Sequence, residues 1–367
     1  MSDWKDCKNI LCIRPDNMGD LVMSIPAIRA LKEMNGARIT LLTSSMAKGI
    51  VPMIQGIDDV IVYDLPWVKA EEAVDQDALT SVVAEIRSRA FDAAVVFTVY
   101  SQNPLPTVML AWMAGIPKRL AYCRENPYGL LTDWVPDPEP YSEIRHQVRR
   151  DLELVHQVGA ESSDLSISLA IDESRWEGLE EKLSRIGIQT ENPWIILHPG
   201  VSEEKRRYPE HLWCELGKEL GEKYQLLITG AASEKCLADS MAACIGDNAF
   251  ALAGHLDLAE FVLLISRSRL VISVNTGTVH LAAATQTPVV VLYALTNPQH
   301  YPWNIHGRVL TFEVPEHLKS RNEVIRYVDK TYFHTPPAPV LPEEIISAVQ
   351  SVLKGDAVLI PELPVLS

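Results

Sequence analysis

A short polar motif between two apolar runs is the part of this sequence best suited to binding an anion. The motif, Asn-Thr-Gly-Thr-Val-His at 275–280, predicts a strand end, a tight turn at Gly277 and the start of a helix. The first N–H groups of such a helix favour a phosphate, and Asn275, Thr276 and His280 could contact a sugar. A purely structural turn with Thr276 as N-cap is the alternative interpretation.

Three consecutive cations follow an earlier apolar run. Lys205, Arg206 and Arg207 lie in the segment 198–210, in a chain whose formal net charge is −15. Arginine forks match phosphate oxygens in pairs and keep their charge, so binding of a diphosphate would explain the cluster. A solvated basic turn is the alternative.

Two carboxylates also lie just past predicted strands. Asp20 follows Gly19 at the mouth of a predicted helix, where it could act as a general base toward an attacking hydroxyl. Glu234 follows the Gly230 turn and could accept hydrogen bonds from a ribose. Both acids equally suit the first turn of a helix, where a carboxylate complements the helix dipole.

Several other sites are not expected. The turn at 14–20 has a single glycine, whereas a dinucleotide fingerprint needs three, so we expect no NAD site. Asp75 and Asp77 match a metal-binding D-x-D pattern, but their polar, helix-like surroundings indicate a solvated face. No cluster of His, Cys and carboxylates has metal-site spacing, and the six cysteines include no C-x-x-C pair. We therefore expect no bound metal and reduced, mostly structural thiols.

Composition sets the broad class of the protein. A chain of 367 residues with 47% hydrophobic residues can form two domains. The strong negative charge argues against a general nucleic-acid binder, which needs a basic face. No apolar run approaches the roughly 20 residues of a membrane-spanning helix, and the first residues do not resemble a signal peptide. We expect a cytoplasmic protein without a nucleic-acid partner.

Short apolar runs alternate with helical patterns in two series. The first has runs at 10–13, 39–43 and 93–97 and a helix at 21–34, and the second has runs at 194–197, 225–228, 270–274 and 288–293. Such alternation predicts an α/β fold with doubly wound parallel sheets. The expected divisions are residues 1–175, 176–335 and a Pro-rich segment with a C-terminal helix at 336–367. Two such halves predict a ligand site in a cleft between them.

Four motifs in this order resemble the bacterial heptosyltransferases, the ADP-heptose-dependent lipopolysaccharide enzymes of glycosyltransferase family 9. The motifs lie at 14–20 with 26–29, at 114–119, at 198–200 with 206–209, and at 275–284. The resemblance covers most of the chain. It implies the GT-B fold of two Rossmann-like domains, the N-terminal one binding the acceptor and the C-terminal one binding the nucleotide sugar.

The resemblance also implies roles for individual residues. It places the general base on Asp20 and the cation beside the donor diphosphate on Arg206. The remaining implied donor-site residues are Lys205, Arg207, Ser202, Glu234, Asn275, Thr276, Gly277 and His280. Many family members carry Asp where this chain has Asn275, which can hydrogen-bond but has no charge. The resemblance implies ADP-heptose as the donor, and Asn275 motivates another nucleotide sugar as the alternative.

The reaction implied is a single inverting displacement that needs no metal or other cofactor. Asp20 would deprotonate the acceptor hydroxyl while fixed cations and helix amides stabilise the leaving diphosphate. The acceptor implied is an anionic, lipid A-linked saccharide, which allows peripheral contact with the inner face of the inner membrane. Arg119, Arg145 and Arg149 are the expected acceptor-binding residues, although solvated charges on a surface helix remain the alternative for some of them.

Two further functions fit the same motifs. A non-catalytic protein that binds a sugar nucleotide would keep the ligand site without the chemistry. A GT-B epimerase fits less well, because the sequence shows no clear second catalytic acid.

Overall fold

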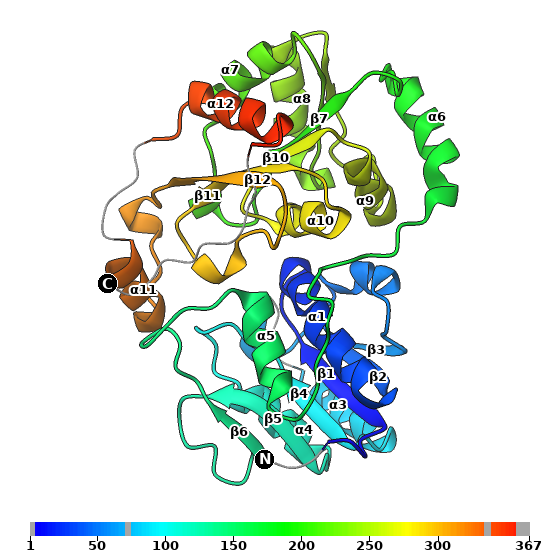
Figure 1. The fold of residues 1–367 in the computed structure, drawn as a ribbon, viewed down its shortest axis with the longest axis vertical. Helices are drawn as coiled ribbons and strands as arrows, with labels where there is room; N and C mark the ends of the chain where they lie inside the picture. The colour runs from blue at the N-terminus through cyan, green and yellow to red at the C-terminus, as the bar shows by residue number, and fades with distance from the viewer. Residues whose placement is uncertain (1–3, 70–74, 334–338, 357–367) are drawn as a thin grey trace. The chain divides into compact units, whose positions relative to one another are not determined.

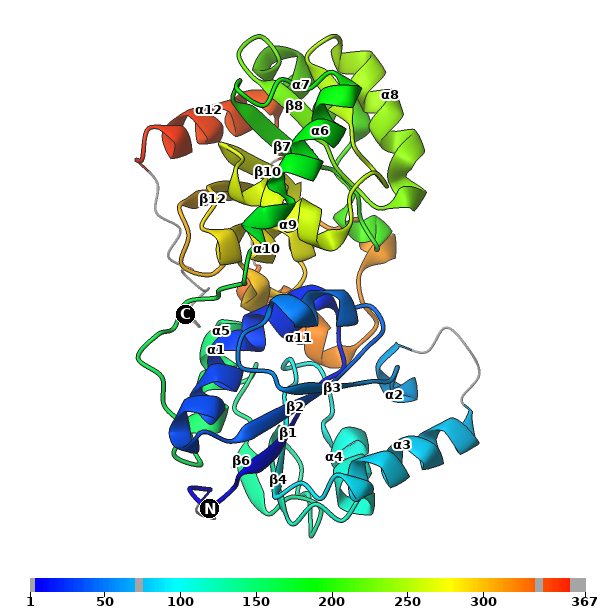
Figure 2. The ribbon, with the colours of Figure 1, turned by 90° about the vertical axis from the view of Figure 1, so that its right-hand side faces the viewer.

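The chain divides into two compact units, each built around its own parallel sheet. The structure is a computed structural model that describes residues 4–69, 75–333 and 339–356. The first unit lies within Met1–Ile167, and the second begins at Ser168. Figures 1 and 2 show the helices and strands of each unit from two sides.

The first sheet has the strand order of a Rossmann fold. Its parallel strands are β1 (Asn9–Arg14), β2 (Arg38–Thr43), β3 (Asp59–Val62), β4 (Ala93–Val96), β5 (Lys118–Cys123) and β6 (Asp133–Pro136). The order β3-β2-β1-β4-β5-β6 means that the chain starts in the middle, builds one half and then crosses to build the other. β1 and β4 are therefore neighbours whose following segments leave in opposite directions. Ligands bind at such a topological switch point, beyond the carboxyl ends of the strands.

Helices cover both faces of this sheet because successive strand residues point to opposite sides. Leu11 and Ile13 of β1 share an apolar core with α3 (Gln76–Ser88) and α4 (Leu105–Met113). On the other face α1 (Met18–Asn35) packs against α5 (Gln147–His156) (Figure 1). The shorter elements are η1 (Lys48–Met53) and α2 (Pro66–Lys69).

The second sheet repeats the plan of the first. Its parallel strands are β7 (Trp194–His198), β8 (Gln225–Ile228), β9 (Ala249–Ala251), β10 (Leu270–Val274), β11 (Val289–Ala294) and β12 (Gly307–Phe312). The order β12-β11-β10-β7-β8-β9 is the order of the first sheet read from its other edge. The switch point here lies between β7 and β10, which are paired through Leu197 and Ile272.

The second unit again has helices on both faces of its sheet. The helices of this unit are α6 (Trp176–Ile186), α7 (Glu210–Leu220), α8 (Lys235–Ile245), α9 (Leu258–Ser266), α10 (Gly277–Thr285), α11 (Glu323–Tyr332) and α12 (Pro342–Leu353). The short turns are η2 (Glu173–Arg175), η3 (Glu204–Arg206), η4 (Ala232–Glu234), η5 (Pro298–His300) and η6 (Glu316–Leu318). Figure 1 shows α7, α8 and α12 on one face of the sheet and α9 and α10 on the other. Within the described residues, no helix has both the length and the apolar character needed to cross a bilayer.

The expected α/β architecture is confirmed, including the C-terminal helix, which is α12. Ile345 and Val349 of α12 are buried in the core of the second unit together with Trp213 of α7. The helix expected at 21–34 is α1, which begins earlier, at Met18, after Asn17 as N-cap. Asp20 is consequently part of the first helical turn.

Candidate functional site

The first unit holds two carboxylates beside a buried arginine at its switch point. Arg14, the last residue of β1, has no exposed surface. Its Nε lies 3.2 Å from Oδ2 of Asp16, and its Nη2 lies 3.4 Å from Oδ1 of Asp20. A guanidinium removed from water requires such partners, because leaving a buried charge unpaired is strongly destabilising. Arg14 thereby fixes both carboxylates at the carboxyl edge of the sheet.

Asp20 serves the start of the helix and is also placed for chemistry. It is the third residue of α1, and its Oδ2 accepts a hydrogen bond from the backbone N–H of Asn17 at 3.2 Å. This contact is the helix-start role of a first-turn acid. The side chain still has 10% of its surface exposed, and its other oxygen faces Arg14. The side-chain amide of Asn17 also donates to Oδ2 of Asp20, at 3.4 Å, so this carboxylate accepts from both Arg14 and Asn17.

Asp16 is a site residue that the sequence analysis did not single out. It lines a polar pocket of about 130 Å³ at the carboxyl edge of the first sheet, and its carboxylate accepts a hydrogen bond from Gln102. Burial is the main cause that raises the pKa of Asp16 above its usual range, with the negative charge of Asp20 adding to it against the effect of Arg14. In the sequence, the signal for Asp16 is its position as an acid two residues after the end of β1. The pocket is lined by Pro15, Asp16, Asn17, Ser44, Met46, Asp64, Leu65, Val68 and Gln102.

A second buried network holds α5 in place behind this edge. Asp151 accepts hydrogen bonds from Ser24 of α1 at 2.6 Å and from Gln147 at 2.7 Å. Burial raises the pKa of Asp151 to about 6. Arg150 donates to both carboxylate oxygens of Asp137, at 2.8 and 2.9 Å. These charged side chains of α5 connect elements of the fold.

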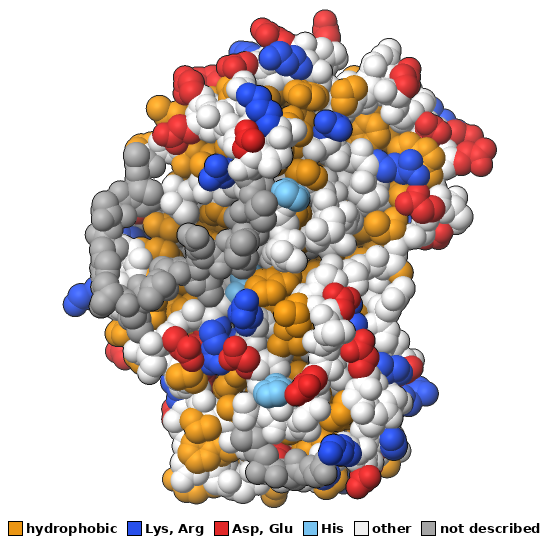
Figure 3. Space-filling model, in the orientation of Figure 1, with side chains coloured by type: hydrophobic (Ala, Val, Ile, Leu, Met, Phe, Trp, Pro, Cys, Tyr) orange, Lys and Arg blue, Asp and Glu red, His pale blue; other side chains and the backbone are white. Residues whose placement is uncertain are grey.

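The three arginines expected to bind the acceptor are not gathered in one place. Arg119 lies near the start of β5, at the opposite edge from the carboxylates, and its guanidinium donates to four backbone carbonyls. Arg145 lies against Glu139 and Glu153. Arg149 is exposed on α5. On the face shown in Figure 3, basic and acidic side chains of the first unit are intermingled. The structure therefore gives Arg119 and Arg145 roles in the fold.

The switch point of the second unit joins the two predicted anion-binding motifs. Arg206, at the end of η3 after β7, donates from Nη1 to the backbone carbonyl of Asn275 at 3.1 Å. Asn275 is the first residue after β10. The other end of the guanidinium, Nη2, lies 3.3 Å from Oε1 of Glu203, and the side chain is 23% exposed. A fixed cation therefore stands just before the start of α10.

The neighbours of Arg206 also pair with carboxylates of the same loop. Nζ of Lys205 lies 2.6 Å from Oε2 of Glu203. Arg207 is 59% exposed, and its Nε lies 3.7 Å from the carboxylate of Glu204. Ser202 is exposed in the same loop. Three cations less two acids leave a net charge of +1 over residues 203–207, so an incoming diphosphate would compete with the loop's own carboxylates.

The segment after β10 forms the expected helix, with one difference in the turn. Thr276 is the N-cap residue with extended backbone, and Gly277 is the first residue of α10. The turn is therefore made by Asn275 and Thr276, while Gly277 is helical. The first N–H groups of such a helix have no acceptor within the helix itself. His280 is buried in the same helix, with its ring 6.5 Å from that of His300.

Glu234 is held between the segments that follow β7 and β8. Its Oε2 accepts a hydrogen bond from the backbone N–H of Ala231 at 2.7 Å, which is the expected first-turn role. A Cβ on Gly200 would lie 2.1 Å from Oε1 of Glu234, and one on Gly230 would lie 2.7 Å from its Oε2. Glycine at both positions leaves the space that this carboxylate occupies. Glu234 lies at the same edge of the sheet as the loop that carries Arg206.

The side chain of Asn275 links two strand ends. Its Oδ1 accepts from the N–H of Ala294 at 3.1 Å, and its Nδ2 donates to the carbonyl of Ala294 at 3.3 Å and to Oγ1 of Thr296 at 3.2 Å. An amide has the donor and the acceptor that this arrangement requires, whereas an aspartate would set an oxygen against the Ala294 carbonyl. The fold thus provides a reason for asparagine at this position.

Asn275→Asp is therefore expected to lower the free energy of unfolding by about 1–3 kcal/mol, because a buried carbonyl loses its donor. Urea denaturation at neutral pH measures the loss. The exposed Asn304 provides a matched control, since Asn304→Asp makes the same chemical change outside the core. Equal stability of the two variants would show that the bonds to Ala294 contribute nothing.

His198 is a half-buried histidine at the carboxyl end of β7. Its Nδ1 lies 2.9 Å from Oγ1 of Thr229, and its ring stacks on Phe261 with the centroids 5.6 Å apart. Burial lowers the pKa of His198 to about 4. Between the usual histidine pKa of 6.5 and about 4 the unfolded chain takes up a proton that the folded chain does not, so stability falls as the pH falls through this window.

We expect wild-type protein to lose about 1–3 kcal/mol more stability than His198→Gln between about pH 7 and pH 4.5, because the glutamine does not titrate. Urea denaturation at several pH values measures the difference. His211→Gln, on the exposed side of α7, is the matched control. Parallel stability curves for wild type and His198→Gln would contradict the assignment.

The comparisons with known proteins point to one family. Residues 79–324 match the model of glycosyltransferase family 9 (heptosyltransferase). Lipopolysaccharide heptosyltransferase 2 of Salmonella typhimurium (strain LT2) is 24% identical to this chain over 362 residues, which cover 95% of this chain and 99% of that protein. Lipopolysaccharide heptosyltransferase 2 of Escherichia coli (strain K12) is 25% identical over 347 residues, with coverage of 91% and 97%.

A solved structure shares the fold. The E. coli ADP-heptose lipopolysaccharide heptosyltransferase II superimposes with a TM-score of 0.71 at 21% identity, covering 95% of this chain and 99% of that one. The two six-stranded parallel sheets, each with the Rossmann order, are the GT-B fold. Since the family model matches more than half of the sequence, including the loops that carry Arg206 and Asn275, this chain belongs to glycosyltransferase family 9.

Proposed function

We propose that this protein transfers a heptose from ADP-heptose to a sugar of a lipid A-linked lipopolysaccharide core. The observation that carries the proposal is the contact of Arg206 with the Asn275 carbonyl, which sets a fixed cation at the N-terminus of α10. That combination suits a nucleoside diphosphate. The relatives' names supply the donor and the class of acceptor. An enzyme with this acceptor would work in the cytoplasm, in peripheral contact with the inner face of the inner membrane.

The proposed reaction is a single inverting displacement. Asp20 accepts the proton of an acceptor hydroxyl as the hydroxyl oxygen attacks the anomeric carbon of the heptose. The bond from that carbon to the diphosphate breaks, and its electron pair leaves on the diphosphate oxygen. Arg206 and the first N–H groups of α10 stabilise the charge that develops there. Arg14 keeps the Asp20 carboxylate oriented.

Binding of the diphosphate exchanges one anion for another. In the structure Glu203 contacts both Lys205 and Arg206. A diphosphate carries more charge than this carboxylate and presents several oxygens to the arginine fork, so it would displace Glu203 from the two cations. The exposed Arg207 can then reach a phosphate oxygen from the outer side of the loop.

Thermal unfolding of the purified protein with ADP, UDP, GDP and dTDP, each with and without EDTA, tests the proposal. We expect ADP to raise the Tm more than the other three nucleotides do, and we expect this shift to survive EDTA. A ligand that binds the folded state adds about 2.7 kcal/mol of stability when it is present at 100 times its Kd. Among the residues that the structure describes, no group of three His, Cys, Asp or Glu side chains could hold a metal ion. Loss of the shift in EDTA would contradict metal-independent binding.

The other outcomes separate the alternatives. A preference for UDP, GDP or dTDP would assign the protein to another nucleotide sugar and a different cell-envelope glycan. Stabilisation by ADP without transfer to any acceptor would favour a non-catalytic binding protein. No response to any of the four nucleotides would contradict the proposed donor site.

A further inference from the structure

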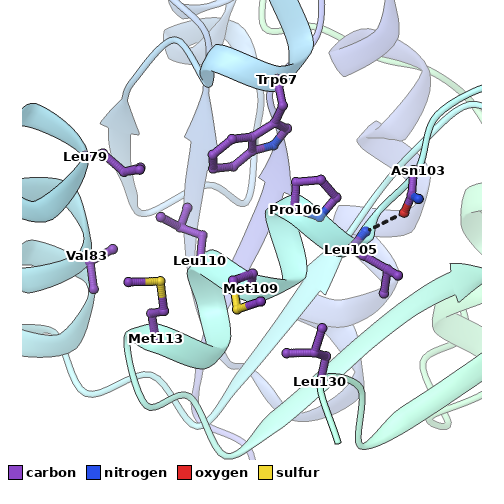
Figure 4. Close-up of a pocket in the computed structure, with 10 residues that line it drawn as sticks. All are labelled: Trp67, Leu79, Val83, Asn103, Leu105, Pro106, Met109, Leu110, Met113 and Leu130. Atoms are coloured by element: carbon purple, nitrogen blue, oxygen red, sulfur yellow. Dashed lines mark hydrogen bonds between the residues drawn. The ribbon is translucent and has the colours of Figure 1, made fainter. Parts of the chain in front are cut away.

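The first unit has an apolar pocket that the transfer reaction does not use. The pocket has a volume of about 520 Å³, which falls within the range of roughly 300–1,000 Å³ typical of small-molecule sites. Figure 4 shows it between α3 and α4, with Trp67 of α2 at one end. Met109 and Met113 of α4 face Val83 of α3 across it. Nine of its ten lining residues are apolar, and the tenth is Asn103.

The pocket is open to solvent in spite of its apolar lining. Met109 is 40% exposed, Met113 is 45% exposed and Trp67 is 36% exposed. A hydrogen bond of 2.8 Å from the Trp67 indole to Oγ1 of Thr107 fixes the ring at the rim. Methionine side chains are flexible and adapt to the shape of an apolar ligand. Small-molecule sites are commonly open pockets of this volume with a mostly apolar lining.

The apolar pocket and the polar pocket that contains Asp16 are lined by neighbouring residues of the same two segments. Val68 of α2 lines the polar pocket, whereas its neighbour Trp67 lines the apolar one. Gln102, which donates to Asp16, lines the polar pocket, whereas the next residue, Asn103, lines the apolar one. A molecule with a sugar head and an apolar chain could therefore occupy both.

We propose that the apolar pocket binds an acyl chain of the lipid-linked acceptor while the polar pocket contacts hydroxyl groups of its saccharide. This inference rests on the proposed transfer reaction and adds a second determinant to acceptor recognition. Each methylene transferred from water into the pocket would tighten binding about fourfold. The first unit would then distinguish acylated from deacylated acceptors by the chain as well as by the sugar.

Quenching of tryptophan fluorescence by bromododecanoic acid tests the pocket without any transfer reaction, because bromine quenches an indole that it contacts. We expect saturable quenching in wild type and a reduced amplitude in Trp67→Phe, which removes the indole at the rim. Met109→Glu should raise the half-saturating concentration at least tenfold, since it sets a charge in the apolar pocket. Met113→Glu, at an equally exposed position, provides a second variant. Equal quenching of wild type and Trp67→Phe would overturn the proposal.

Transfer kinetics with acylated and deacylated acceptors test the role of the chain. The quantity compared is kcat/KM with the acylated acceptor divided by kcat/KM with the deacylated acceptor. We expect Met109→Glu to lower this ratio at least tenfold. Trp112→Glu is the matched control, because Trp112 lies on the same helix, is 51% exposed and does not line the pocket. An equal fall of the ratio in Trp112→Glu would indicate general adhesion to lipid and overturn the proposal.

The two experiments also separate this inference from the proposed function. In one outcome, Met109→Glu weakens binding of bromododecanoic acid but wild type transfers heptose to no acceptor. The proposed function then fails, and the pocket binds an acyl chain that does not belong to an acceptor. If wild type transfers heptose equally well to both acceptors, with the same ratio in Met109→Glu, the proposed function stands and the acyl pocket is refuted.

Discussion

In the Asp20→Asn variant, kcat for heptose transfer is expected to fall by about 10²–10⁴-fold, the usual contribution of a positioned general base. Asparagine has the size of aspartate and can still accept a hydrogen bond from the Asn17 N–H through its one carbonyl oxygen, so the helix start is preserved, while its NH2 group replaces the oxygen that faces Arg14. It cannot take up the proton of the acceptor hydroxyl. Steady-state kinetics with ADP-heptose and a lipopolysaccharide-core acceptor measure the loss.

A matched control separates loss of the base from loss of a helix-start acid. Asp77 is a first-turn acid of α3, as Asp20 is of α1. Asp77→Asn should leave kcat unchanged, and thermal unfolding of both variants shows whether they are folded. A folded Asp20→Asn protein with more than a tenth of wild-type kcat would remove Asp20 from the proposed chemistry.

The second large effect is expected at Arg206. Arg206→Gln should lower kcat/KM by about 10²–10³-fold, comparable to removal of a transition-state charge stabiliser. The variant loses the cation beside the start of α10 and frees the Asn275 carbonyl that the guanidinium holds. Arg206→Lys should recover part of the activity, because it restores the charge but not the fork that contacts two groups at once.

Arg207 provides the comparison within the same loop. It is exposed, and its nearest carboxylate lies at 3.7 Å, so Arg207→Gln should cost less than Arg206→Gln. Binding of ADP measured by calorimetry tells whether the loss in each variant concerns the ground state or only the transition state. A larger loss for Arg207→Gln would assign the principal diphosphate contact to Arg207.

Most of the inner strands could be predicted from the sequence, whereas the edge strands and the inner strand β5 could not. β1, β7, β10 and β11 are continuous apolar runs because both faces of a doubly wound sheet are covered. The edge strand β9 has only three residues, all half-buried, and β12 is half-buried along most of its length. Short, partly exposed strands do not form the apolar runs on which the prediction depends.

For the candidate donor site, the sequence could predict which loops lie together. Arg206 and Asn275 both follow strands of one parallel sheet, and the carboxyl ends of such strands meet at one edge. The partners of individual side chains were not predictable. Asn275 bonds to Ala294, and Arg119 bonds to backbone carbonyls of adjoining loops. Such pairings depend on tertiary packing, and the residue types alone suggested ligand contacts instead.

The separate apolar cores of the two units affect how unfolding of this protein is to be measured. One core is built on β1 and its neighbours, and the other is built on β7, β10 and α12. A chain with two separate apolar cores can unfold in more than one cooperative step. Asn275→Asp and His198→Gln both alter the second core's unit, so their effects belong to one transition in a denaturation curve. A global two-state fit would spread these local effects over the whole chain and understate them.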